Sequence, residues 1–170
     1  MAKAKMPYEI IQDLAIKYDK LSDAKVLDKL RAIPPLPDGD DASSWEQTFW
    51  DNVAYHYLAL WRVVCVRQLR VAIPLILDRA CFGDPGETMR GMCHILEGIV
   101  RPNWSELTPY CVAALKSERA GTRKWAAFQL ARLRERSALS ALEEAEGDPI
   151  PDVRSEIQKA IRSTREALSE

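Results

Sequence analysis

The stretch GTRKWAAFQLARLRER, residues 121–136, contains the pattern from which the fold of this chain is predicted. Its apolar residues recur at intervals of three and four, as an amphipathic α-helix requires; they are Ala126, Ala127, Leu130 and Leu133. Its polar side chains are expected mostly off that stripe; they are Arg123, Lys124, Gln129 and Arg132. The two alanines are small, so the backbone of a neighbouring helix can approach closely.

The residues around this stretch predict a helix, a second shorter helix and a turn. Thr122 is the expected N-cap of the first helix, since a threonine side chain can accept a hydrogen bond from a free backbone N–H. SALSALEEAE, residues 137–146, predicts the second helix. The turn GDPIPD, residues 147–152, then separates it from a further helix over 153–168.

This arrangement recurs along the chain. An arginine early in the first helix is repeated from Arg90 to Arg123 after 33 residues, and again at Arg154 after 31. In the second helices, Pro74 is followed by Pro109 after 35 residues. A period of this length with two helices in each period is typical of stacked helical repeats.

On these residues, the chain resembles the HEAT-repeat family over residues 45–163, and especially the short repeats of bilin-lyase-type proteins. The resemblance implies an all-α, right-handed α-solenoid of about three HEAT-like helical hairpins with an atypical helical N-terminal cap. It is informative about the fold and says little about function, because such repeats serve many roles.

The family also has an aspartate in the turn before each first helix, which pairs with the early arginine. The resemblance implies this role for Asp84 before Arg90 and for Asp148 before Arg154. No aspartate precedes Arg123 at that distance, so the pattern is incomplete there. We interpret these arginines as structural, because adjacent repeats need polar partners that fix their stacking.

The chain is predicted to be one domain with three segments. Residues 1–33 form a helical hairpin in which Pro7 suits the first turn and Ser22 or Asp23 caps the second helix. Residues 34–44 form a loop rich in proline and aspartate, which we interpret as solvated rather than as a cation site. Residues 45–170 contain the repeats.

The first repeat is expected to open with the longest helix, from Trp45 to Leu69, capped by Ser43 or Ser44. Apolar and aromatic side chains occur on nearly every side of this helix, which predicts burial on several faces. His56 lies among them, and we interpret it as a core histidine with a hydrogen-bond partner rather than as a catalytic base.

The remaining helices are expected over 70–83, 89–100 and 105–117, with Ser105 as a cap. The side chains predicted for the core are Phe49, Val53, Leu60, Ile76, Leu96, Leu115, Ala127 and Leu130.

Composition narrows the classes of function. The chain has 170 residues, 47% of them hydrophobic, and a net charge of −1, which together argue against disorder and against general binding to nucleic acid or membrane surfaces. Neither a signal peptide nor a membrane span is expected, so we expect a cytoplasmic protein. The four cysteines lack CxxC spacing, and they are expected to be buried free thiols without a metal.

Charge is unevenly distributed. Residues 59–135 carry 12 basic and 7 acidic side chains, whereas acidic side chains predominate in the segments before and after them. A solvated face with uneven charge explains this distribution, and a surface for an acidic partner is the alternative.

No catalytic motif is recognised, and no cofactor is expected; the chain lacks GxSxG, HExxH and a glycine-rich phosphate loop. The prediction is therefore a non-enzymatic protein-binding module, with Arg70, Arg79, Trp104 and Lys116 on the surface of the second helices. Trp104 either anchors a partner or packs over the start of its own helix. A bacterial immunity protein that blocks a toxin is one concrete version. A nucleic-acid-binding protein of the DNA-glycosylase-like HEAT type is the alternative, followed by a bilin lyase or chaperone.

Overall fold

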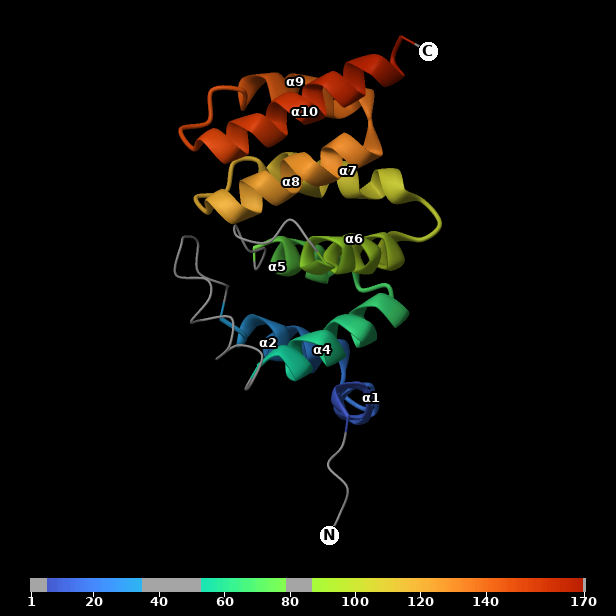
Figure 1. Cartoon of the computed structure of the whole chain (residues 1–170). Helices are drawn as coiled ribbons and strands as arrows, with labels where there is room; N and C mark the ends of the chain where they lie inside the picture. The colour runs from blue at the N-terminus through green and yellow to red at the C-terminus, as the bar shows by residue number, and fades with distance from the viewer. Residues whose placement is uncertain (1–5, 35–52, 79–86, 170) are drawn as a thin grey trace.

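A computed structural model of the chain describes residues 6–34, 53–78 and 87–169, and every secondary-structure element in these ranges is helical (Figure 1). The chain is therefore all-α, as predicted. The α-helices are α1 Pro7–Tyr18, α2 Asp23–Arg31, α4 Ala54–Val66, α5 Ile73–Leu77, α6 Glu87–Val100, α7 Thr108–Ala114, α8 Ala120–Leu133, α9 Leu139–Glu144 and α10 Pro151–Ala167. The short 3₁₀ helices are η1 Arg70–Ala72, η2 Trp104–Leu107 and η3 Arg136–Ala138. In the described parts of the chain, no helix is both long enough and apolar enough to span a membrane.

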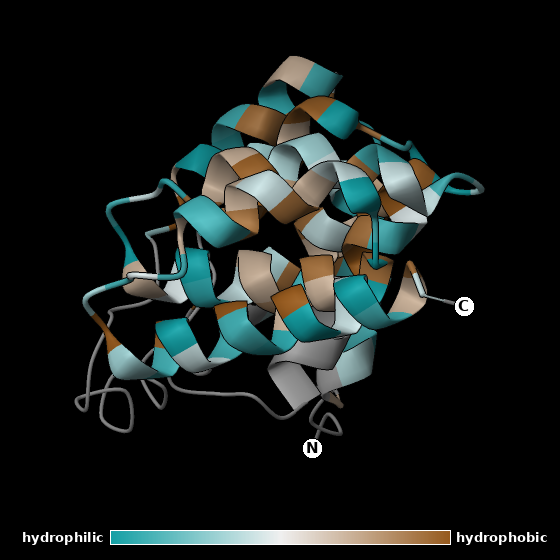
Figure 2. Ribbon diagram, turned by 90° about the horizontal axis from the view of Figure 1, so that it is seen from above, coloured by the Kyte–Doolittle hydropathy of each residue, from teal (hydrophilic) through white to brown (hydrophobic). Residues whose placement is uncertain are grey.

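The helices form layers that follow one another in chain order (Figure 1). Helix α1 lies at one end and packs on α4, and α2 also contacts α4. The layers α5 with α6, α7 with α8 and α9 with α10 follow, so that the C-terminus lies at the opposite end of the molecule. Hydrophobic and hydrophilic residues alternate along the ribbons in Figure 2, as expected for helices that are buried on only part of their surface.

The second helices of the predicted repeats, α5, α7 and α9, have the same local design. Each begins with a 3₁₀ turn and continues as a short α-helix, in the orders η1–α5, η2–α7 and η3–α9. Pro74 and Pro109 lie in the first turns of α5 and α7, where a missing backbone N–H breaks no intrahelical hydrogen bond. These helices are shorter than the sequence predicts, because the residues before each one form the 3₁₀ turn.

Two predicted helix starts are wrong. Helix α8 begins at Ala120, and Thr122 lies inside it, where its buried hydroxyl donates to the backbone oxygen of Leu77 at 3.1 Å. Helix α4 begins at Ala54 after Val53, which lies in a turn, so no continuous helix runs from Trp45. The predicted caps Ser43 and Ser44 and most of the 34–44 loop lie outside the described residues.

The two helices predicted at the N-terminus are present as α1 and α2. Pro7 lies in the first turn of α1, and Ser22 is the N-cap of α2. Arg67 fixes the hairpin to the end of α4: its guanidinium donates to Asp19 at 3.1 Å and to Asp23 at 2.7 Å. It also donates to the Leu21 backbone oxygen at 3.0 Å. One side chain therefore bridges both helices of the hairpin to the first repeat.

The core agrees largely with the predicted residues. The confirmed buried side chains are Leu60, Ile76, Leu96, Leu115, Ala127 and Leu130. Val53 is only half-buried, because it precedes α4 rather than lying within the helix, and Phe49 lies outside the described residues. Tyr57 and Trp61 of α4 are buried with ring centroids 4.2 Å apart, which confirms the aromatic core of that helix.

Helix α8 is buried on more sides than its sequence pattern predicts. It packs extensively on α10 and also on α7. Trp125 and Gln129, which lie off the predicted apolar stripe, are fully buried beside Ala126 and Leu130. The prediction that Gln129 lies off the buried face is therefore wrong, because helices on two sides leave this part of α8 without a solvent face.

The contact between α4 and α6 depends on the absence of a side chain at Gly98. Gly98 is buried, and a Cβ atom added there would overlap the sulfur of Cys65 while lying 3.9 Å from the Cys65 Cβ. Burial raises the pKa of the Cys65 thiol, so the neutral thiol occupies this space at neutral pH. The sulfur thus fills the space that a larger residue 98 would need.

We expect Gly98→Ala to lower the free energy of unfolding by about 1–3 kcal/mol, the usual cost of overpacking. The double variant Cys65→Ala/Gly98→Ala should recover most of this loss, because the new methyl group replaces the sulfur. Urea denaturation of the wild type, both single variants and the double variant forms the double-mutant cycle. An additive double variant would contradict the contact.

Candidate protein-interaction surface

An exposed tryptophan borders a groove between the second and third layers. We call this feature the Trp104 groove; its lining residues are Glu97, Trp104, Ala131, Arg132, Leu133 and Arg134. The groove has a volume of about 510 Å³. Trp104 is 52% exposed, the only tryptophan among the large hydrophobic side chains exposed in the described part of the chain. A large exposed indole next to arginines has the composition of a protein-binding hot spot.

The short helix η2 holds Trp104 outward. Asn103 precedes it in an extended conformation and accepts a 2.6 Å hydrogen bond from the hydroxyl of Ser105. Leu107 at the end of η2 is fully buried, and Glu106 accepts a hydrogen bond from Arg70 at 2.6 Å. Because Leu107 and Glu106 fix the turn on two sides, the indole of Trp104 projects from a rigid support.

Glu97 and Arg132 form the polar wall of the groove. Glu97 of α6 is buried, and its carboxylate accepts a hydrogen bond from the guanidinium of Arg132 of α8 at 2.7 Å. The exposed ring of His94 lies 3.8 Å from the other carboxylate oxygen. The charge of the Glu97 carboxylate is therefore neutralised mainly by Arg132, and the buried carboxylate in turn holds the Arg132 guanidinium in place.

Arg134 has a different environment. It follows the last residue of α8 and adopts the left-handed conformation, with φ 54° and ψ 31°. The left-handed backbone ends the helix. The Arg134 N–H still closes the last turn, because it donates to the backbone oxygen of Leu130 at 3.0 Å. Gln68 has the same conformation after α4, with φ 53°. The left-handed residue therefore recurs after α4 and α8 but not after α6, and it does not require a charged side chain.

The predicted site residues have different environments. Trp104 lies in the groove, and Lys116 is exposed beyond the far end of α7. Arg70 is bound to Glu106, and this hydrogen bond lowers the pKa of the Glu106 carboxyl. Arg79 lies outside the described residues. Sequence reasoning missed Arg132 and Arg134; the run of arginines that begins at Arg132 was the available signal.

Trp104 was predicted either to anchor a partner or to pack over the start of its own helix, and its exposed surface leaves the first role available. The residue that packs into the core at this turn is Leu107, with no exposed surface, while about half of the indole faces solvent. The indole therefore keeps free surface for contacts outside the chain.

A buried ion pair joins α8 to the turn before α10, away from the groove. The guanidinium of Arg123 contacts both carboxylate oxygens of Asp148, at 2.6 and 3.1 Å, and also donates to the backbone oxygen of Ser117. The Ile150 N–H donates to Asp148 at 2.9 Å, and Arg154 donates to the Asp148 backbone oxygen. The expected Asp148–Arg154 side-chain pair is thus corrected: the carboxylate binds the arginine of the preceding repeat.

The other polar residues singled out from the sequence show no reactive geometry. His56 was predicted to lie in the core, and this is wrong because the residue is exposed. Its Nδ1 lies within hydrogen-bond distance of the Tyr18 hydroxyl. Cys111 is a buried free thiol, whereas Cys65 is half-buried. Within residues 6–34, 53–78 and 87–169, no group of three histidine, cysteine or carboxylate side chains is placed to hold a metal ion.

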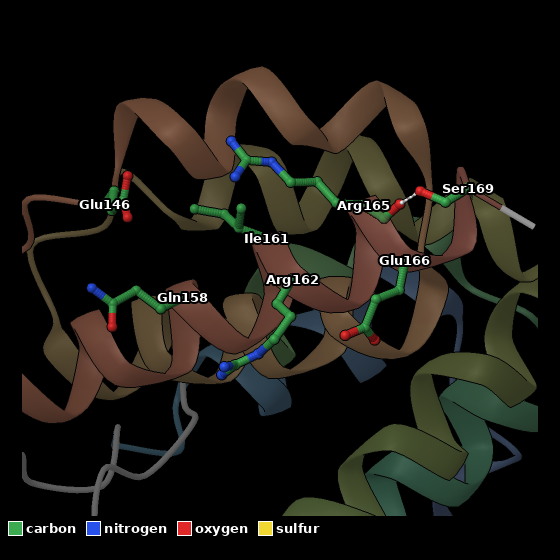
Figure 3. Close-up of a pocket in the computed structure, with 7 residues that line it drawn as sticks. All are labelled: Glu146, Gln158, Ile161, Arg162, Arg165, Glu166 and Ser169. Atoms are coloured by element: carbon green, nitrogen blue, oxygen red, sulfur yellow. Dashed lines mark hydrogen bonds between the residues drawn. The ribbon is translucent and has the colours of Figure 1, made fainter.

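A second groove, of about 690 Å³, lies along α10 at the C-terminal end of the layers (Figure 3). Arg162 and Arg165 extend from α10 to opposite sides, with Glu146 and Glu166 also on the lining. Arg165 is bound to Glu143 at 2.6 Å. Charges of both signs and the absence of an aromatic residue from its lining make this groove a weaker candidate than the Trp104 groove.

Searches of protein-family models, of curated proteins and of solved structures find no significant match to this chain.

Proposed function

We propose that this chain is a non-enzymatic protein-binding module and that the Trp104 groove is its binding surface. The observation that carries the proposal is the half-exposed indole on a rigid turn, next to the arginines of the following repeat. Tryptophan and arginine are enriched among the residues that contribute most to protein–protein affinity. A preformed anchor also loses little conformational entropy on binding.

The proposed architecture behind this function is a right-handed α-solenoid of about three HEAT-like hairpins with an atypical N-terminal cap. The layered helices, the repeated 3₁₀ turns and the inter-repeat arginine contacts support it. In such an architecture each repeat contacts its neighbours, and binding surfaces extend across several repeats. The specific version that we propose is a bacterial immunity protein, whose partner is the toxin that it blocks.

Trp104→Ala is expected to abolish or strongly weaken partner binding, by about 30-fold or more for a hot-spot residue. The experiment is affinity capture from native lysate with tagged protein, treated with nuclease and identified by mass spectrometry. A stoichiometric protein that is captured by the wild type and lost with Trp104→Ala supports the proposal.

Tyr8→Ala is the matched control, because Tyr8 is an exposed aromatic residue at the opposite end of the chain, 64% exposed. It should capture the same partner as the wild type. Both variants should keep the wild-type thermal midpoint, since neither side chain is in the core. Equal capture by Trp104→Ala and wild type would exclude this groove as the binding surface.

Nucleic-acid binding is the second candidate function, because exposed arginines directly follow two of the first helices, Arg101 after α6 and Arg134 after α8. Neutralising phosphates releases counterions, so this function requires affinity that falls steeply with salt. Capture that disappears with nuclease would place this candidate first.

A further inference from the structure

We propose that the Trp104 groove recognises an acidic protein segment in which a carboxylate lies next to an apolar or aromatic side chain. This inference rests on the proposed protein-binding function and specifies the chemistry of the partner. The apolar side chain would pack on the exposed face of Trp104, and the carboxylate would bind the guanidinium of Arg134.

The first step of the argument is the difference between the two arginines of the groove. Arg132 is bound to the buried carboxylate of Glu97 at 2.7 Å, so its charge is already compensated. Arg134 is exposed, and its guanidinium makes no ion pair with another residue in the described ranges. A planar guanidinium without a partner is suited to bind an incoming carboxylate through two parallel hydrogen bonds.

The second step is that the uncompensated charge continues beyond the groove. Arg101 precedes Trp104 by three residues and Arg136 follows Arg134 by two; both are exposed, and neither has an ion-pair partner among the described residues. Arg101 lies in the loop before η2, and Arg136 is the first residue of η3. The surroundings of Trp104 are therefore positive although the whole chain has a net charge of −1.

The third step distinguishes an acidic protein segment from a nucleic acid. Carboxylates are interspersed among these arginines: Glu97 lines the groove, Glu135 separates Arg134 from Arg136, and Glu106 follows Trp104. Glu97 and Glu106 already neutralise Arg132 and Arg70, so the remaining positive charge sits on separate arginines rather than on a continuous track for a phosphate backbone. A protein segment can place single carboxylates opposite single arginines, so the alternating pattern favours a protein partner.

The fourth step is the left-handed backbone of Arg134. Glycine adopts φ near 54° without the steric cost that a Cβ atom brings. Arg134→Gly therefore removes the guanidinium without harming the end of α8. Gln68→Gly makes the same backbone change after α4 without removing a lining residue of the groove. Because the Gln68 side chain also donates to the backbone oxygen of Arg101 at 3.0 Å, Gln68→Gly is a stringent matched control.

The test is selection of phage-displayed random short peptides on the full-length wild type, followed by affinity measurements with the synthetic peptides. The expected consensus contains aspartate or glutamate beside an aromatic or aliphatic residue. Trp104→Ala and Arg134→Gly should each weaken binding about tenfold or more, whereas Gln68→Gly should bind like the wild type. Arg134→Gly should melt at the wild-type temperature or above it.

A consensus without acidic residues, no enrichment at all, or equal binding by Arg134→Gly would overturn this inference. So would oligothymidine binding that is lost in Trp104→Ala and Arg134→Gly. The proposed function is tested separately by capture from lysate. That capture can depend on Trp104 whatever the chemistry of the partner, so it can succeed even if the acidic-segment inference fails. Loss of that dependence would refute the proposed function itself.

Discussion

Replacing Leu130 by aspartate is expected to unfold the protein. Leu130 has no exposed surface and lies in α8, which packs against α10 and α7. The change removes a buried apolar side chain and introduces a carboxylate that has no partner in this environment. Together these effects should cost more than about 5 kcal/mol, which approaches or exceeds the total stability of a typical domain.

Circular dichroism and thermal melting measure this effect directly. Lys116→Glu is the control, because Lys116 is exposed and a surface substitution usually changes stability by no more than about 0.5 kcal/mol. A Leu130→Asp variant that melts like the wild type would show that the register of α8 is wrong.

Asp148→Asn is expected to produce the second largest loss, about 3–5 kcal/mol. The Asp148 carboxylate has little exposed surface and binds Arg123, whose side chain is only 12% exposed. Without the carboxylate, the guanidinium of Arg123 remains charged and half-enclosed between two repeats. The measurement is the urea midpoint of the variant relative to the wild type.

The double variant Arg123→Met/Asp148→Asn separates the contribution of the ion pair to the free energy of unfolding from the other effects of each substitution. Removing both charges leaves no unpaired buried charge, so the double variant should lose much less than the sum of the single variants. Additive losses would contradict a direct interaction between the two side chains.

The same pair makes stability depend on pH. Burial raises the pKa of Asp148, but the hydrogen bonds from Arg123 and the Ile150 N–H, with the charges of Arg123 and Arg154, outweigh it. The net pKa is therefore lower in the folded state than the value of about 3.9 in the unfolded chain. The stabilisation is complete above the unfolded pKa and is lost as pH falls through the folded pKa. Asp148→Asn should remove this part of the acid sensitivity.

The fold class could be predicted from the sequence because helical periodicity is a local property. The apolar spacing in residues 121–136 and the prolines at 74 and 109 act through the backbone of their own helices, and α8, α5 and α7 are present. The starts of α1 and α2 were likewise predicted from Pro7 and Ser22. These elements required no knowledge of distant contacts.

The errors have a common physical origin in contacts between layers. Gln129 reads as a surface residue in sequence, yet α8 is covered by helices on two sides. Thr122 reads as a cap, yet its hydroxyl binds the Leu77 backbone oxygen, 45 residues away along the chain. Local sequence cannot specify which repeat covers which face.

The sequence alone therefore determined that the chain is helical, where most of its helices lie and that an aromatic residue, Trp104, begins one of the short second helices. Only the tertiary structure decided which charges remain available. It binds Arg70 to Glu106 and Arg123 to Asp148, and it leaves Arg134 beside Trp104. Ion pairs between residues that are 25 to 36 positions apart depend on how the layers stack, and that stacking, rather than the local pattern, selects the candidate binding surface.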